Sequence, residues 1–314
     1  MEKKMYAFTS LMAGFFCLVI FSSFNKVNAT VEDSTATLLS PSTATMKRVT
    51  GFNLHKEFAF AGEVLPTENF DARERLDREL AVNTYMESIT LLNIKTANRY
   101  FPIIEPILKK NGIPDDFKFL CVAESNLRMA TSPAGAKGLW QFIDSSGKAY
   151  GLEINSEVDE RYNVEKSTEA ACHFLQHLKD RFGSWTMAAA AYNMGPALLA
   201  KRVEEQQEND YYNLNLNEET SRYVFRIIAI KEIMKDPERF GFYVEPEQLY
   251  PPLTEYNTIS IDGPIPSLSA LAKQYGTTYR MLKLYNPWLI DTALTNKYKK
   301  HYDIRLPKQP VDTN

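Results

Sequence analysis

The chain has 314 residues and a formal net charge of −3, with 36 Lys and Arg against 39 Asp and Glu. This length accommodates two domains in addition to a leader segment. A slightly acidic chain lacks the basic surface that broad nucleic-acid binding requires, so we expect no nucleic-acid partner.

The N-terminus is typical of a secretory signal peptide. Lys3 and Lys4 precede an apolar run over residues 11–24, and small residues up to Ala29 suit a cleavage site. The run is too short for a comfortable transmembrane helix. We therefore expect residues 1–29 to be a signal peptide and the mature protein to be secreted across the inner membrane into the periplasm. An uncleaved anchor that keeps the protein at the envelope is the alternative.

The composition changes after the leader. Residues 30–70 begin with a stretch rich in Ser, Thr and Ala, which has no apolar period, and continue as irregular sequence. We expect a flexible or irregular segment there. Residues 71–110 show helical periodicity, with Asp71 placed to cap the first helix. Pro102 and Pro106 are expected to interrupt this region.

The next predicted helix carries an acid on its apolar face. Phe117, Leu120, Cys121 and Glu124 stand at i, i+3, i+4 and i+7, so they share one face. Burial disfavours the charged form of a carboxyl group and keeps it protonated near neutral pH, as a general acid requires. The helix alone favours the alternative, a glutamate at the edge of the core that pairs with an Arg or a Lys.

Four further helices are predicted between this one and residue 240, where strand signals are nearly absent. A short helix starts at Asp144 and ends near Gly151, and an amphipathic helix covers residues 165–182. Ser184 caps a helix that ends before Gly195-Pro196, and residues 220–235 form the last. The fold class is therefore mainly α.

A proline-rich connector separates the helical block from a different tail. Residues 258–261 and 302–306 read as strands, with two short helices between them. This pattern indicates a β-α-α-β module. We expect two domains, a helical domain over residues 71–245 and a small module over residues 254–308.

Two pairs of side chains leave alternatives open. Cys121 and Cys172 both lie in helical, apolar contexts, which suits either two buried thiols or one disulfide. His173 and His177 have the i, i+4 spacing of a metal pair, but no third histidine stands near them. We therefore expect a solvated or core-edge pair, no metal site and no cofactor.

Four segments in a fixed order indicate a known family. They are Glu124-Ser125, residues 138–141 (Gly-Leu-Trp-Gln), residues 190–196 (Ala-Ala-Tyr-Asn-Met-Gly-Pro) and residues 219–224 (Glu-Thr-Ser-Arg-Tyr-Val). This order and spacing resemble the lytic transglycosylases of the family 1 Slt type, which have the lysozyme-like fold of glycoside hydrolase family 23. The likeness is strongest to the membrane-bound lytic transglycosylase D branch. Each motif is weak alone, and the four together are specific.

The resemblance implies roles for individual residues. Glu124 matches the single catalytic acid/base of the family. Six residues match its substrate-binding positions: Ser132, Gln141, Tyr192, Asn193, Glu219 and Tyr223. Without the resemblance, Gln141 would be a satisfied polar residue of a loop, Tyr192 and Asn193 the end of a helix, and Glu219 a helix-start acid. This chain departs from the family after Glu124-Ser125, where residues 127–129 (Leu-Arg-Met) replace an aromatic residue and a proline.

The tail resembles a LysM peptidoglycan-binding module. Its first helix, the Gly-Thr-Thr at residues 276–278 and the Leu-Tyr-Asn-Pro at residues 284–287 match that pattern. Residues 262–268 (Asp-Gly-Pro-Ile-Pro-Ser-Leu) replace the usual Gly-Asp-Thr-Leu opening. That loop helps to form the glycan groove of such modules, so the resemblance implies the fold and leaves sugar binding open.

The implied function is cleavage of the β-1,4 bond between N-acetylmuramic acid and N-acetylglucosamine, with formation of a 1,6-anhydro ring. The expected partner is the glycan strand of peptidoglycan, at the cell wall, and the expected state is a monomer. Two alternatives are a hydrolytic lysozyme of the goose type on the same fold and a non-catalytic peptidoglycan-binding scaffold. The mass of the released product distinguishes a lytic transglycosylase from the lysozyme, because the anhydro product is one water lighter than the hydrolytic product. Peptidoglycan binding after removal of the tail tests the scaffold alternative.

Overall fold

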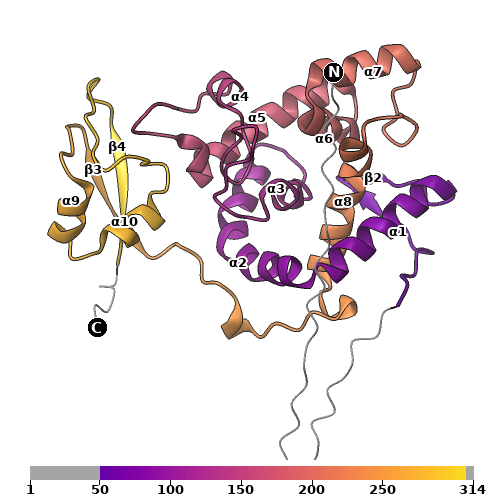
Figure 1. The fold of residues 1–314 in the computed structure, drawn as a ribbon, viewed down its shortest axis with the longest axis horizontal. Helices are drawn as coiled ribbons and strands as arrows, with labels where there is room; N and C mark the ends of the chain where they lie inside the picture. Colours follow the sequence, from indigo (N-terminus) through magenta and orange to yellow (C-terminus); the bar gives the residue numbers. More distant parts are fainter. Residues whose placement is uncertain (1–49, 309–314) are drawn as a thin grey trace, which may run out of the picture. The chain divides into compact units, whose positions relative to one another are not determined.

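The computed structural model describes residues 50–308 (Figure 1). The predicted signal peptide and residues 30–49 of the predicted flexible or irregular segment lie outside these residues. Within the described part, no helix has both the length and the apolar character that crossing a membrane requires. The helical elements of the first domain are α1 (Phe70–Tyr85), α2 (Glu87–Lys110), α3 (Phe117–Ser125), α4 (Asp144–Ala149), η1 (Glu160–Tyr162), α5 (Val164–Phe182), α6 (Trp185–Met194), α7 (Pro196–Gln206) and α8 (Glu218–Lys235).

The core of this domain forms around α3 and α8. Helix α8 packs against α1, α3 and α6, while α5 packs against α2 and α6. Figure 1 shows α3 in the middle of this arrangement. Residues 188–191 of α6 are four alanines with 0 % exposure, and their lack of bulk lets neighbouring helices approach closely. This packing places the end of α3 beside α8, where the candidate acid and its neighbours meet.

The expectation that two prolines interrupt the helical region was wrong for helix α2. It runs continuously through Pro102 and Pro106, and both side chains are exposed. The two residues are four positions apart, so they lie on the same solvent-facing side. The carbonyl groups that lose their N–H partners there can bond to water, and the buried face of the helix keeps its packing. The start of α1 also differs, because Asn69 rather than Asp71 is the cap and accepts from the Asp71 N–H over 3.0 Å.

The predicted irregular region before α1 contains a short antiparallel hairpin, β1 (Ala59–Phe60) and β2 (Glu63–Val64). Phe60 has 0 % exposure and contributes to the main core. The Glu63 carboxylate accepts from the Thr186 N–H over 2.8 Å at the start of α6, where helix N–H groups have no partner within the helix. The hairpin therefore belongs to the folded domain.

The region after Gly195-Pro196 is helical as well. The predicted stop is correct for α6, but Pro196 immediately opens α7. Proline suits the first helical position because the N–H it lacks would have no partner there. The sequence therefore predicted the end of α6 correctly but did not predict helix α7.

The tail forms the predicted β-α-α-β module after a connector with two 3₁₀ turns, η2 (Glu238–Phe240) and η3 (Pro246–Gln248). Its elements are β3 (Tyr256–Ile261), α9 (Leu268–Gln274), α10 (Tyr279–Tyr285) and β4 (Tyr302–Pro307). Strands β3 and β4 pair antiparallel, from Tyr256 opposite Pro307 to Ile261 opposite Tyr302. The module has its own apolar core, which includes Leu268, Leu282 and Leu289.

Candidate functional site

Glu124 occupies the last turn of α3, as predicted. Phe117, Leu120 and Cys121 on the same face all have 0 % exposure, whereas Glu124 is partly exposed. The helix ends directly after it, because Asn126 adopts the left-handed conformation with φ 50°. The carboxyl group is therefore held against the core, while its position at the helix end leaves it partly exposed.

The surroundings of Glu124 raise the pKa of its carboxyl group from 4.5 to about 7. Burial is the largest cause of this rise, and the negative charge of Glu219 acts in the same direction. The hydrogen bond from Tyr223 and the positive charge of Arg226 act in the opposite direction. At neutral pH and below, about half or more of the molecules therefore carry the proton that a general acid needs.

Two tyrosines enclose the acid. Tyr223, from α8, is 1 % exposed and donates its hydroxyl proton to Glu124 Oε1. Tyr192, from α6, donates its hydroxyl proton to the Trp140 carbonyl over 2.7 Å. Burial, and next the charge of Glu124, raises the pKa of both phenols, so both remain neutral hydrogen-bond donors. The structure thus brings Tyr223 into contact with the acid and places Tyr192 at the segment that carries Gln141.

Residues 131–142, here called the motif loop, hold the next two predicted residues. Gln141 has φ 50° and donates from Nε2 to the Gly138 carbonyl over 2.7 Å. The Ser132 hydroxyl oxygen accepts from the Ala136 N–H over 3.0 Å. Both side chains therefore shape the loop itself in this structure, which is the alternative role considered for Gln141.

The remaining predicted residues come together at the start of α8. Asn193 Oδ1 accepts from Thr220 Oγ1 over 2.7 Å, so the end of α6 is bonded to α8. Glu219 is exposed, and it acts on Glu124 through its charge. Sequence reasoning missed Thr220, although it lies within the fourth motif, and Arg226, which lies outside every motif and gave no signal.

The two cysteines are free buried thiols, so this structure contradicts the disulfide alternative. Cys121 Sγ donates to the Leu139 carbonyl over 3.4 Å, and burial raises its pKa well above the ordinary value. His177 Nδ1 lies 2.9 Å from the Tyr150 hydroxyl. Among residues 50–308, no group of three or more His, Cys, Asp and Glu side chains could hold a metal ion. Cys121 thus behaves as a small core residue beneath the site.

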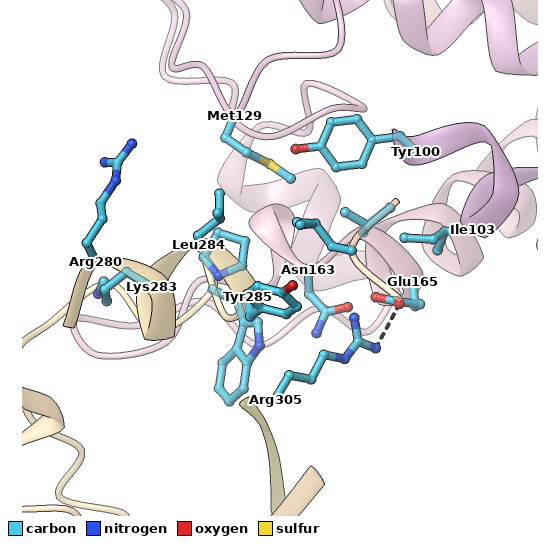
Figure 2. A pocket seen from close by; sticks show the side chains of 14 residues that line it. Tyr100, Ile103, Met129, Asn163, Glu165, Arg280, Lys283, Leu284, Tyr285 and Arg305 are labelled. Atoms are coloured by element: carbon cyan, nitrogen blue, oxygen red, sulfur yellow. Dashed lines mark ion pairs between the residues drawn. The ribbon is translucent and has the colours of Figure 1, made fainter. Parts of the chain in front are cut away.

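A cavity of about 220 Å³ lies apart from Glu124, between α2 and the tail module (Figure 2). Tyr100 lines it from α2 and Tyr285 from α10. The ion pair between Arg305 Nη2 and Glu165 Oε1, 2.7 Å apart, closes one side. None of the predicted site residues lines this cavity.

Comparison with known families matches two segments of the chain. The Transglycosylase SLT domain family matches residues 101–215, and the soluble lytic transglycosylase C-terminal LysM-like domain family matches residues 257–310. The chain therefore contains a lysozyme-like SLT transglycosylase domain followed by a LysM-like domain, as the resemblance implied. The SLT match includes Glu124, whereas Glu219 and Tyr223 lie beyond its end.

Two of the three curated relatives described here match most of this chain. Membrane-bound lytic murein transglycosylase D of Escherichia coli (strain K12) is 29 % identical over 268 residues, which are 81 % of this chain and 56 % of the relative. The protein of the same name from Escherichia coli O6:H1 gives the same values. A putative tributyltin chloride resistance protein of Alteromonas sp. (strain M-1) is 31 % identical over 121 residues, 38 % of this chain and 58 % of the relative. The chain thus spans little more than half the length of the curated relatives it matches.

Proposed function

We propose that this chain, in which an SLT transglycosylase domain precedes a LysM-like domain, is a lytic transglycosylase of peptidoglycan. The bond cleaved is the β-1,4 linkage between N-acetylmuramic acid and N-acetylglucosamine. The observation that carries the proposal is the Glu124 carboxyl group, whose pKa of about 7 results first from burial and which accepts a hydrogen bond from Tyr223. A neutral carboxyl group at an open helix end is suited to protonate a glycosidic oxygen.

The proposed reaction uses one carboxyl group twice. Glu124 donates its proton to the bridging oxygen as the bond from that oxygen to C1 of the muramic acid breaks. The acetamido oxygen of the same sugar stabilises the cationic C1. The Glu124 carboxylate then takes the proton of the C6 hydroxyl group, whose oxygen attacks C1 and closes the 1,6-anhydro ring. Atoms balance without water, and Glu124 ends protonated for the next cycle.

The neighbouring residues serve orientation in this proposal. Because Thr220 donates to Asn193 Oδ1, the amide nitrogen of Asn193 is the group that donates to the acetamido carbonyl of the substrate. Tyr192 is fixed by the Trp140 carbonyl beside Gln141, so it forms a wall between the acid and the motif loop. Ser132 and Gln141 keep the loop in shape and contact the sugar from it.

The organisation of the molecule follows from the same proposal. The catalytic domain covers residues 71–245 together with the hairpin of residues 59–64, and the LysM-like module covers residues 254–308. The mature protein acts in the periplasm as a monomer on glycan strands, with no cofactor. The two relatives named membrane-bound lytic murein transglycosylase D match 81 % of this chain and support the proposal.

Substitution of Glu219 distinguishes the proposed mechanism from hydrolysis that uses two carboxylates. In Glu219→Gln, we expect the loss of a negative charge to lower the pKa of Glu124, because that charge raises it. The falling limb of kcat/KM against pH should therefore move to lower pH, while turnover below that limb stays within about 5-fold of the wild type. The measurement is the pH profile of product release from purified sacculi. If Glu219 were a second catalytic carboxylate, turnover would fall by about 10²-fold or more at every pH.

Substitution of Tyr223 is expected to shift the falling limb of the pH profile in the opposite direction. Its hydrogen bond lowers the pKa of Glu124, so Tyr223→Phe should raise that pKa and move the falling limb to higher pH. The change removes only the hydroxyl group from a buried ring, and the fold should persist. The same pH profile tests the expectation, with Tyr298→Phe as the control because Tyr298 is 84 % exposed in the module. A falling limb that remains at the wild-type pH would show that the hydrogen bond from Tyr223 does not lower the pKa of Glu124.

A further inference from the structure

Residues 153–159, here called the docking strip, join the SLT domain to the LysM-like module by backbone pairing. The N–H of Asp159 donates to the Trp288 carbonyl over 2.8 Å, and the N–H of Ile290 donates to the Glu157 carbonyl over 2.9 Å. These two bonds form an antiparallel bridge between the strip and the loop after α10. The module is therefore bonded to the catalytic domain at a second place besides its connector.

Side chains of the strip complete this contact. Val158 is 1 % exposed and belongs to the apolar core of the module, with Leu268 and Leu289. Glu157 Oε2 accepts from both the N–H and the hydroxyl group of Thr295, each over 3.0 Å. A core residue of the module is thus supplied by the catalytic domain, and undocking would expose it to water.

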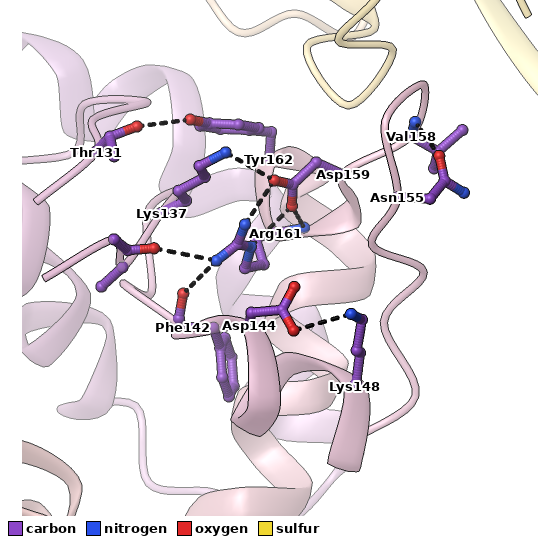
Figure 3. Close-up of polar contacts among 12 residues, drawn as sticks. Thr131, Lys137, Phe142, Asp144, Lys148, Asn155, Val158, Asp159, Arg161 and Tyr162 are labelled. Carbon is purple, nitrogen blue, oxygen red and sulfur yellow. Dashed lines mark hydrogen bonds and ion pairs between the residues drawn. The ribbon is translucent and has the colours of Figure 1, made fainter.

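The other side of the strip holds the motif loop (Figure 3). The Asp159 carboxylate is 1 % exposed and accepts from Arg161 Nε over 2.8 Å and Nη2 over 2.7 Å. Arg161 Nη1 in turn donates to the carbonyls of Gly135 and Phe142, each over 3.2 Å. Lys137 Nζ, within the loop, lies 3.3 Å from the same carboxylate. The buried Asp159–Arg161 pair therefore fixes the loop at three points.

We propose that docking of the LysM-like module orders the motif loop, with Asp159 as the positioning residue that links the two. Its backbone bonds to Trp288 of the module, and its side chain orients Arg161, which holds the loop. The effect on turnover rests on the proposed function, because the loop carries Ser132 and Gln141. The module then acts on substrate positioning in the neighbouring domain, whether or not it binds glycan itself.

Val158→Lys in the mature full-length protein tests the coupling. A charged side chain in the apolar core of the module should release the strip, which limited proteolysis of the connector detects. Amide hydrogen exchange in the motif loop should then rise about 5- to 30-fold, which lies within the range typical of coupling between sites. With a soluble peptidoglycan oligosaccharide as substrate, KM should rise by a similar factor. The value of kcat, and the pH at which activity falls, should stay unchanged.

Two further variants sharpen the experiment. Val64→Lys makes the same chemical change at a residue that is 56 % exposed on β2, and it should alter neither exchange nor KM. Asp159→Asn keeps the backbone bond to Trp288 but weakens the hold on Arg161. It should raise loop exchange and KM while the connector stays protected from protease.

The outcomes are distinct. Release of the module by Val158→Lys with unchanged loop exchange would overturn the proposal. If that variant does not fold, Asp159→Asn decides, and unchanged loop exchange there would overturn the proposal equally. A wild-type protein without turnover on any peptidoglycan would refute the proposed function alone, since the exchange measurements would still settle the coupling between module and loop.

Discussion

Glu124→Gln is expected to reduce release of muropeptides from purified sacculi by about 10³-fold or more, because the acid and base steps of the proposed route both use this side chain. Glutamine keeps the size of the side chain and can accept the hydrogen bond from Tyr223, so the site should keep its shape. The measurement is product release at pH 6, where the wild-type carboxyl group is mostly protonated.

The same variant provides its own folding control. A glutamate whose pKa is raised from 4.5 to about 7 destabilises the folded state progressively as pH rises between these values. Glutamine does not titrate, so Glu124→Gln should be more stable than the wild type at pH 8, by roughly 1–3 kcal/mol, and nearly equal to it at pH 4. Chemical denaturation at the two pH values measures this. Near-normal turnover by the folded variant would reject Glu124 as the acid.

Gly138→Ala is expected to have the largest effect on stability. Gly138 has φ +78°, and an added Cβ would lie 1.9 Å from the Arg161 carbonyl oxygen, which belongs to the backbone. The loop would have to move away from Arg161, with a loss of roughly 3–5 kcal/mol in the free energy of unfolding. Thermal or chemical denaturation measures the loss, and Gln141 should be displaced with the loop.

Gly135→Ala is the matched control for that prediction. Gly135 lies in the same loop at the same φ of +78°, but an added Cβ would meet nothing within 4 Å. Its cost should be limited to the backbone conformation, about 1–2 kcal/mol. Equal losses in the two variants would show that the close approach of Gly138 to Arg161 does not constrain the loop.

Helix α3 shows why the position of Glu124, though not its role, could be predicted from the helix pattern. Three residues at helical spacing with 0 % exposure define the buried face, and the fourth position of that spacing is Glu124. Local periodicity is enough to place a side chain on a face. The same reasoning predicted the elements of the tail, since β3, α9, α10 and β4 all depend on short-range patterns.

Other features depend on contacts that local patterns do not contain. The hydrogen bond from Arg161 Nη1 to the Phe142 carbonyl joins residues that are 19 positions apart. The hydrogen bond from the Asp159 N–H to the Trp288 carbonyl joins the two domains. The continuity of α2 through Pro102 was likewise decided by tertiary packing over local propensity. Sequence reasoning therefore placed Glu124 on the buried face and identified the SLT motifs, but it did not find the network that supports the loop or the docked module.

The most direct test of the central claim is the mass of the muropeptides that the mature protein releases from purified sacculi. The proposed single-acid route predicts products with a 1,6-anhydro ring, each one water lighter than its hydrolytic counterpart. Products of the hydrolytic mass would contradict it and indicate a lysozyme on the same fold.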